Sequence, residues 1–129
     1  MRVLTFAVIL FSLLSGCSNS IKPEELYGRW NYIKVTNSKP EESLTAAELS
    51  AQAPAITFSK DQRLVIEWGG KPLSYGKFRM EGPMIRYTET LEGNRTREFP
   101  FLITKLTEHE LVFQTMEQEF TTVTAKKQR

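Results

Sequence analysis

Short apolar runs alternate with turn-forming residues along most of the chain. From residue 26 onward these runs are rich in β-branched and aromatic residues, and pairs such as Gly69-Gly70 and Gly93-Asn94 separate them. Glycine and asparagine tolerate the positive φ angles that tight hairpins require. The pattern predicts eight strands, at residues 28–35, 55–59, 63–68, 73–80, 84–91, 95–106, 110–116 and 119–126. Short strands joined by hairpins indicate an all-β antiparallel meander in a barrel or a sandwich.

One segment between the first two strands departs from this pattern. Residues 36–53 contain Pro40 and then Thr45-Ala46-Ala47-Glu48. A threonine followed three residues later by glutamate is typical of a capping box, so we expect a short helix from there to about Gln52. The helix either covers an open end of a barrel or is one helical turn in a surface loop.

The two central hairpins predict which side chains face inward. Two-residue turns at Gly82-Pro83 and Gly93-Asn94 would place Phe78 opposite Tyr87 and Ile85 opposite Leu102 on an apolar face. The other face carries a basic group of side chains, Lys77, Arg79, Arg86 and Arg97. This basic face is either a solvated surface or a contact for an anionic partner.

Two aromatic residues conflict with that register. Phe99 and Phe101 fall on the wet face, on either side of Pro100. Proline donates no ladder hydrogen bond and often marks a bulge. We therefore expect a bulge at Pro100 that turns Phe101 inward and leaves Phe99 exposed.

The same register places Glu89 opposite Glu98 on the inward face. Two buried carboxylates would raise the pKa of one of them and would resemble a binding or acid–base site. If both lie at the barrel rim, they are solvated. The rim interpretation is favoured, because charged side chains are seldom fully buried.

The first seventeen residues have the features of a secretion signal. Arg2 precedes an apolar stretch over residues 3–14, and small residues lead to Cys17. This arrangement is typical of a signal peptide. A retained transmembrane helix is the alternative, but twelve helical residues rise only about 18 Å, against a hydrocarbon core of ~30 Å.

The motif Leu14-Ser15-Gly16-Cys17 resembles the lipobox of bacterial lipoproteins. The resemblance implies that Cys17 receives acyl chains such as palmitate and that the chain is cut before it, and two or more chains make a stable anchor. Cys17 is also the only cysteine, so lipidation would leave no disulfide and no thiol for chemistry. Ser18 replaces the aspartate associated with inner-membrane retention, so the resemblance favours the outer membrane of the cell envelope.

These features divide the chain into four parts. We expect a signal peptide at residues 1–16, a lipidated polar tether at 17–25, one β domain at 26–126 and a tail at 127–129. Without Arg2, 16 basic residues balance 15 acidic ones. Such a balance gives no reason to expect a nucleic-acid partner.

The start of the first strand, Gly28-Arg29-Trp30, resembles the opening of lipocalins. Three later segments, at residues 56–61, 75–78 and 106–112, resemble the small lipocalin-like domains of bacterial lipoproteins. The resemblance implies a small lipocalin-like barrel in which the tryptophan closes one end and an arginine of the last strand crosses it. Residues 119–126 hold no arginine, which leaves Lys126 or Arg129 for that position.

The sequence offers no catalytic constellation. His109 is the only histidine, so neither a histidine-based triad nor a multi-histidine metal site can form. We therefore expect no enzyme, no metal site and no cofactor, and the sequence identifies no protein partner.

Two functions remain open. The lipocalin resemblance implies a barrel that binds a small apolar or amphipathic ligand. Its interior would be lined by Trp30, Phe58, Trp68, Phe78, Tyr87, Leu102 and Phe113. Alternatively these residues form a packed core, and the domain is a structural or interaction module that acts through its loops or outer face. An enclosed void above ~300 Å³ that opens at one end of the barrel would favour a ligand, and a solid interior would favour the module.

Overall fold

A computed structural model describes residues 20–129 of the chain. The predicted signal peptide and the lipidation site at Cys17 lie outside these residues. Within residues 20–129, the structure contains no helix that is both long enough and apolar enough to cross a membrane.

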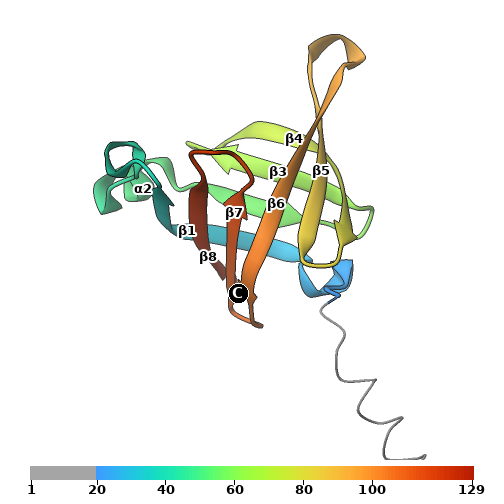
Figure 1. Cartoon of the computed structure of the whole chain (residues 1–129), viewed down its shortest axis with the longest axis horizontal. Coiled ribbons are helices and arrows are strands. Elements are labelled where there is room, and N and C mark those ends of the chain that lie inside the picture. The colour runs from blue at the N-terminus through green and yellow to red at the C-terminus, as the bar shows by residue number, and fades with distance from the viewer. Residues whose placement is uncertain (1–19) are drawn as a thin grey trace, which may run out of the picture.

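Eight antiparallel strands form a closed barrel (Figure 1). They are β1 (Gly28–Asn37), β2 (Ala55–Phe58), β3 (Arg63–Trp68), β4 (Lys71–Glu81), β5 (Met84–Thr90), β6 (Thr96–Leu106), β7 (Glu110–Thr115) and β8 (Thr121–Lys127). Each strand pairs with its neighbours in sequence, and β8 pairs back with β1. The predicted meander is confirmed, with strand ends within two residues of those expected. All strands and the closing pair lie within residues 20–129, so this segment contains the complete barrel.

The predicted helix between the first two strands is also present. Helix α2 (Ala46–Gln52) begins after Thr45, whose hydroxyl oxygen accepts a hydrogen bond from the Glu48 amide at 3.1 Å. Leu49 is buried against the core. The carbonyl of Gln52 accepts from the amide of Gly69 at 2.7 Å. Helix α2 therefore lies at the end of the barrel where the β3–β4 turn is found.

The opposite end of the barrel is closed around Trp30. This fully buried side chain donates from its indole Nε1 to the carbonyl of Leu26 at 2.8 Å. A 3₁₀ turn, η1 (Pro23–Glu25), leads into Leu26, and the amide of Ile21 donates to the carbonyl of Gly82 in the β4–β5 turn. The chain thus enters the barrel at this end, which we call the closed end.

At the closed end, the positively charged side chain of Lys127 lies over the ring of Trp30. Lys127 is the register partner of Trp30, and its Nζ lies 5.2 Å from the centroid of the indole ring. The expectation of Lys126 or Arg129 in this position was wrong. Strand β8 extends to residue 127, and alternation places Lys127 on the same face as the buried Val123 and Ala125.

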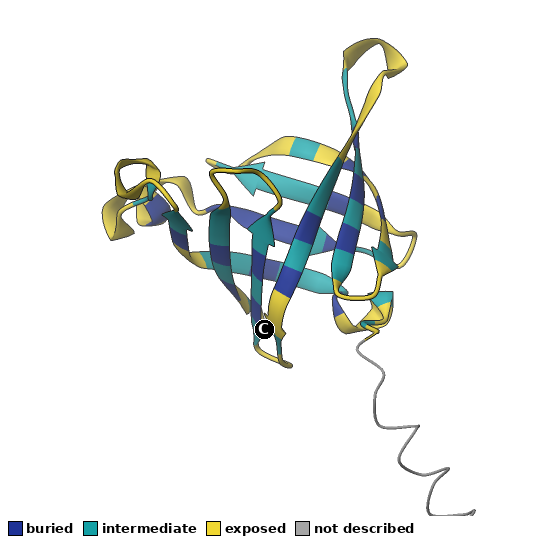
Figure 2. Cartoon of the chain, in the orientation of Figure 1, coloured by how far each residue is buried: buried dark blue, intermediate teal, exposed yellow. Residues whose placement is uncertain are grey.

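The interior is filled mainly by large apolar side chains. Buried positions alternate with more exposed ones along the strands, as Figure 2 shows in dark blue. Aromatic rings pack edge to face in the pairs Phe58–Phe78 and Phe101–Phe113, with centroids 5.1 Å and 5.4 Å apart. Edge-to-face contacts of this kind are typical of a packed apolar core.

The β5–β6 hairpin does not have the predicted turn. Thr90 pairs with Thr96, the amide of Leu91 donates to the carbonyl of Arg95 at 2.8 Å, and a 3₁₀ turn, η3 (Glu92–Asn94), connects the strands. Gly93 and Asn94 have positive φ as expected, but Glu92 also belongs to the turn. One additional turn residue shifts every pairing between β5 and β6 by one position.

This shift reverses the faces of β6. Ile85 lies opposite Phe101, and the predicted pairing of Ile85 with Leu102 was wrong. Phe101 is buried without a bulge at Pro100, because the β5–β6 pairing is continuous from Thr96 to Leu102. Phe99 is partly buried against the core and is not exposed as predicted.

The predicted basic outer face is largely neutralised. Lys77 lies 4.0 Å from a carboxylate oxygen of Asp61, and both Arg79 and Arg86 lie within 3.9 Å of one from Glu98. Arg97 does not belong to this face. The remaining basic side chains and their acids form exposed ion pairs, which contribute little to stability and fit a solvated surface.

Replacing Lys127 by methionine tests the closed end. The substitution keeps most of the side-chain volume and removes the charge over Trp30, a contact that contributes about 0.5–1 kcal/mol at a partly exposed site. We expect the free energy of unfolding to fall by about that amount in urea titrations followed by tryptophan fluorescence. Lys126→Met, one residue away on the outer face, is the control. Equal losses in both variants would contradict a specific contact with the indole.

Candidate ligand-binding site

A pocket of about 380 Å³ opens at the end of the barrel opposite Trp30. Its walls come from the upper parts of β3 to β7. The lining residues are Ile66, Leu73, Ser74, Tyr87, Glu89, Arg97, Phe99, Phe101, Thr115 and Glu117. We call this end the mouth. Below the pocket, large apolar side chains such as Tyr87, Phe101 and Phe113 form the buried core of the barrel.

The pocket forms where strand β4 separates from strand β5. Residues 71–75 of β4 pair with β3, whereas β4 pairs with β5 only from Gly76 onward. Gly76 permits this close approach, because a Cβ atom there would lie 2.0 Å from the carbonyl oxygen of Thr88. Beyond this point the β5–β6 hairpin projects past the rest of the barrel (Figure 1).

A buried carboxylate forms the polar centre of the pocket. Glu89 is only 8% exposed and is the one buried charged residue within the described segment. Its Oε1 accepts from Nε and Nη2 of Arg97 at 3.0 Å and 2.8 Å, and its Oε2 accepts from the Ser74 hydroxyl at 2.5 Å. A buried carboxylate with a charged partner and a hydroxyl donor avoids the full cost of desolvation.

The direction of the adjoining hydrogen bond follows from the number of available protons. The hydroxyls of Ser74 and Tyr87 lie 2.5 Å apart. Ser74 has one hydroxyl hydrogen, and it is donated to Glu89. Tyr87 must therefore donate to Ser74, which gives a relay from Tyr87 through Ser74 to Glu89.

Tyr87 remains a neutral donor over a wide pH range. Burial raises its pKa to about 12, and the negative charge of Glu89 adds to the rise. The side chain is 1% exposed. At neutral pH the phenol is protonated, so the relay is intact.

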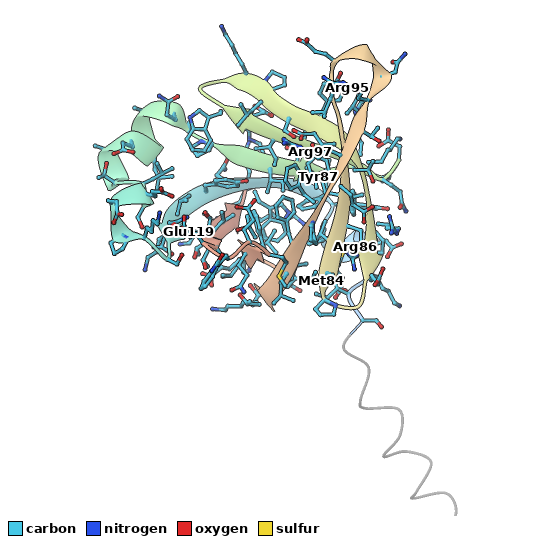
Figure 3. The ribbon with its side chains drawn as sticks, turned by 45° about the horizontal axis from the view of Figure 1, so that its top comes forward. Met84, Arg86, Tyr87, Arg95, Arg97 and Glu119 are labelled. Carbon is cyan, nitrogen blue, oxygen red and sulfur yellow. The ribbon has the colours of Figure 1, made fainter. Side chains whose placement is uncertain are left out.

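Arg97 reaches the carboxylate from the solvent side. Its side chain is 55% exposed, and its guanidinium lies 4.3 Å from the centroid of the Phe99 ring. Figure 3 shows Arg97 close to Tyr87 on the neighbouring strands, with Arg95 farther out on the hairpin and Arg86 lower on β5. Arg97 thus bridges the buried carboxylate and the entrance of the pocket.

The predicted pairing of Glu89 with Glu98 was wrong. In the observed register Glu89 lies opposite Arg97, and Glu98 lies opposite Thr88 on the outer face. The inward orientation of Glu89 was predicted correctly, but the favoured interpretation of a solvated rim position was wrong, since Glu89 is buried. Its partner is a cation rather than a second carboxylate because of the three-residue turn.

The residues predicted to line a ligand cavity separate into three groups. Tyr87 lines the pocket. Four others are buried core residues away from it, namely Trp30, Phe58, Phe78 and Phe113. Trp68 is a partly exposed residue at the end of β3, and Leu102 lies on the face opposite to Phe101 and Ile103. The inward placement of Leu102 was wrong for the same reason as the pairing of Glu89 with Glu98.

Sequence reasoning missed Ser74 and Arg97 as members of the site. Ser74 belongs to the part of β4 that leans away from β5, and no local pattern marks that separation. Arg97 was assigned to the outer face by a turn one residue too short. Alternation along β5 places Ile85, Tyr87 and Glu89 on the same inward face. This pattern was the available signal for an inward polar group.

A larger hollow of about 770 Å³ lies at the closed end. It is bounded by η1, the β6–β7 turn and the last residues of the chain, including His109 and Arg129. None of the residues that line this hollow is a buried polar residue. The mouth pocket is the candidate site because it combines an apolar lining with a buried, hydrogen-bonded charge.

The raised pKa of Tyr87 predicts a change in stability at alkaline pH. An unfolded tyrosine ionises near its ordinary pKa of 10.0, below the folded value of about 12. The unfolded state therefore loses its proton first, and stability falls as pH rises through that interval. In Tyr87→Phe the free energy of unfolding should decline less steeply between pH 10 and 12, measured by urea titration. Tyr75→Phe, on the outer face of β4, is the control, and an equal effect there would contradict the assignment.

The comparisons with known proteins bear on the fold. No family model matches the chain, and no curated protein matches it. It is similar to a solved structure described as a redesigned beta barrel, with a TM-score of 0.51 and 16% sequence identity over 87% of this chain and 99% of that one. At this identity the similarity shows the fold alone, which is a β-barrel.

Proposed function

We propose that this chain is a membrane-anchored bacterial lipoprotein whose lipocalin-like barrel binds a small apolar or amphipathic ligand at its mouth. The anchor is the lipid on Cys17, and the location is the cell envelope, at the outer membrane. The proposed role is binding rather than catalysis. The lipobox-like motif supports the anchor, and the mouth pocket supports the ligand.

The observation that carries the ligand proposal is the composition of the pocket. Its volume of about 380 Å³ falls within the range of small-molecule sites. Apolar side chains from three strands, Ile66, Leu73 and Phe101, share it with a buried carboxylate. An apolar wall with one fixed polar centre suits a ligand that has an apolar body and a polar group.

A packed interaction module is the second candidate. It is favoured by the large side chains that are buried in the barrel interior, among them Trp30, Phe58 and Phe113. The β5–β6 hairpin also projects with an exposed tip, shown in yellow in Figure 2, and offers a surface for a protein partner. In this case the mouth would bind no small molecule.

A blocked pocket distinguishes the two candidates. We expect residues 20–129 to bind the neutral fluorophore N-phenyl-1-naphthylamine saturably, because the apolar mouth removes it from water. Thr115→Trp fills the pocket from the end of β7 and should weaken binding by about tenfold or more, through loss of buried apolar area. Thr104→Trp, exposed on β6, is the control. Without saturable fluorescence in the unchanged barrel, the packed module becomes the better description.

The anchor is tested separately in the full chain. Cys17→Ser removes the only thiol that can carry the lipid. We expect the variant to incorporate no labelled palmitate and to leave the membrane fraction of a bacterial host, because membrane binding depends on the buried acyl chains. Ser18→Ala is the matched control and should remain labelled. Palmitate incorporation into the Cys17→Ser chain would contradict the anchor.

A further inference from the structure

We propose that the mouth pocket selects a cationic group, an ammonium or guanidinium carried on an apolar body, and that Arg97 occupies this position when the pocket is empty. The inference rests on the ligand-binding function proposed above and specifies the chemistry of its ligand. It comes from the charges that line the pocket and from the way Arg97 enters it.

The charged lining of the pocket is acidic on balance. Glu89 and Glu117 supply two carboxylates, and Arg97 supplies one guanidinium. The other lining residues are neutral, and the raised pKa of Tyr87 keeps its phenol protonated. In a partly desolvated site a net negative charge favours a cation and opposes a carboxylate.

The carboxylate of Glu89 has unused acceptor capacity. A carboxylate has about four acceptor positions. Both bonds from Arg97 go to Oε1, and Oε2 accepts only from Ser74. A ligand N–H group can therefore bind at Oε2 while the Ser74 hydroxyl remains in place.

Arg97 already shows how a cation fits this position. Its guanidinium donates to the buried carboxylate and at the same time lies over the ring of Phe99. A carboxylate beside an aromatic face is a favourable environment for an ammonium or a guanidinium. Because the Arg97 side chain is 55% exposed, it can rotate into solvent and leave both partners to a ligand.

The opposite assignment makes Arg97 an anchor for an anion. The anion would use the N–H groups of Arg97 that do not contact Glu89. It would then lie in the same pocket as Glu89 and Glu117, and both carboxylates would repel it. The two assignments predict opposite effects when Arg97 is removed.

Three probes with eight carbon atoms each separate the head-group chemistry from the apolar contribution. Octylammonium, octanol and octanoate are titrated calorimetrically into residues 20–129 at pH 7, below their aggregation concentrations. We expect octylammonium to bind roughly tenfold more tightly than octanol, about one charge-assisted hydrogen bond, and octanoate to bind most weakly. Equal affinities would overturn the cation proposal and leave the ligand-binding function standing. Absence of binding by all three would overturn both.

Variants of the charged residues test whether the removal of Arg97 strengthens or weakens the binding of each probe. Arg97→Gln removes the internal competitor, so octylammonium should bind several-fold more tightly and octanoate no better. Tighter octylammonium binding together with unchanged octanoate binding in Arg97→Gln supports the internal competitor, because loss of an anion anchor would weaken octanoate binding. Weaker octanoate binding with unchanged octylammonium binding would overturn the proposal. Arg86→Gln, an arginine on the outer face of β5, is the matched control and should leave all three affinities unchanged.

A second variant keeps the test valid if Arg97→Gln fails to fold, since it leaves Glu89 without its charged partner. Glu117→Gln alters an exposed residue after β7 and should weaken octylammonium binding while strengthening octanoate binding. Circular dichroism establishes that each variant is folded at the assay temperature. The same change for both charged probes, or none, would contradict the assigned role of Glu117.

Discussion

The turn between β5 and β6 determines what the mouth of this barrel can do. Its three residues, Glu92–Asn94, set the pairing that points Phe101 into the core and Arg97 into the pocket. A turn one residue shorter would place Glu98 beside Glu89 and leave two carboxylates on the same inward face. Because strand side chains alternate with a period of two, one residue in a turn decides between an ion pair and a repulsive pair. The apolar lining and the charge balance of the pocket both depend on that choice.

The two ends of the barrel differ in how their strands are paired and packed. At the closed end Trp30 is fully buried and is held by Leu26 and Lys127, so strands β1 and β8 are fixed where they meet. At the mouth, β4 leaves β5 at Gly76 and the hairpin continues without a neighbour on either side. A site that admits a ligand needs such a region of lower packing, and the dense core below it supplies the compensating stability.

Much of the fold could be predicted from the sequence, because alternation and turn residues are local signals. All eight strands and the helix after Thr45 follow from them. The site was harder to predict because it depends on relations between strands. Gly93 and Asn94 indicated a turn, but their identities do not distinguish two residues from three, since Glu92 takes part with negative φ. The alternation of β5 predicted that Glu89 faces inward. The contribution of Ser74 could not be predicted, because it depends on where β4 departs from β5.

The position of the chain entry also constrains how a ligand reaches the mouth. Under the lipid anchor proposed at Cys17, only four residue steps separate the lipid from Ile21, a span of at most about 14 Å. Ile21 bonds to the β4–β5 turn at the closed end. Such an anchor would hold the closed end near the membrane, with the mouth at the far end of the barrel. A ligand drawn from the anchoring bilayer would have to leave it completely before meeting Glu89. An amphipathic cation with appreciable solubility in water makes that passage more readily than a fully apolar lipid, so the geometry of the anchor and the charge of the pocket favour the same class of ligand.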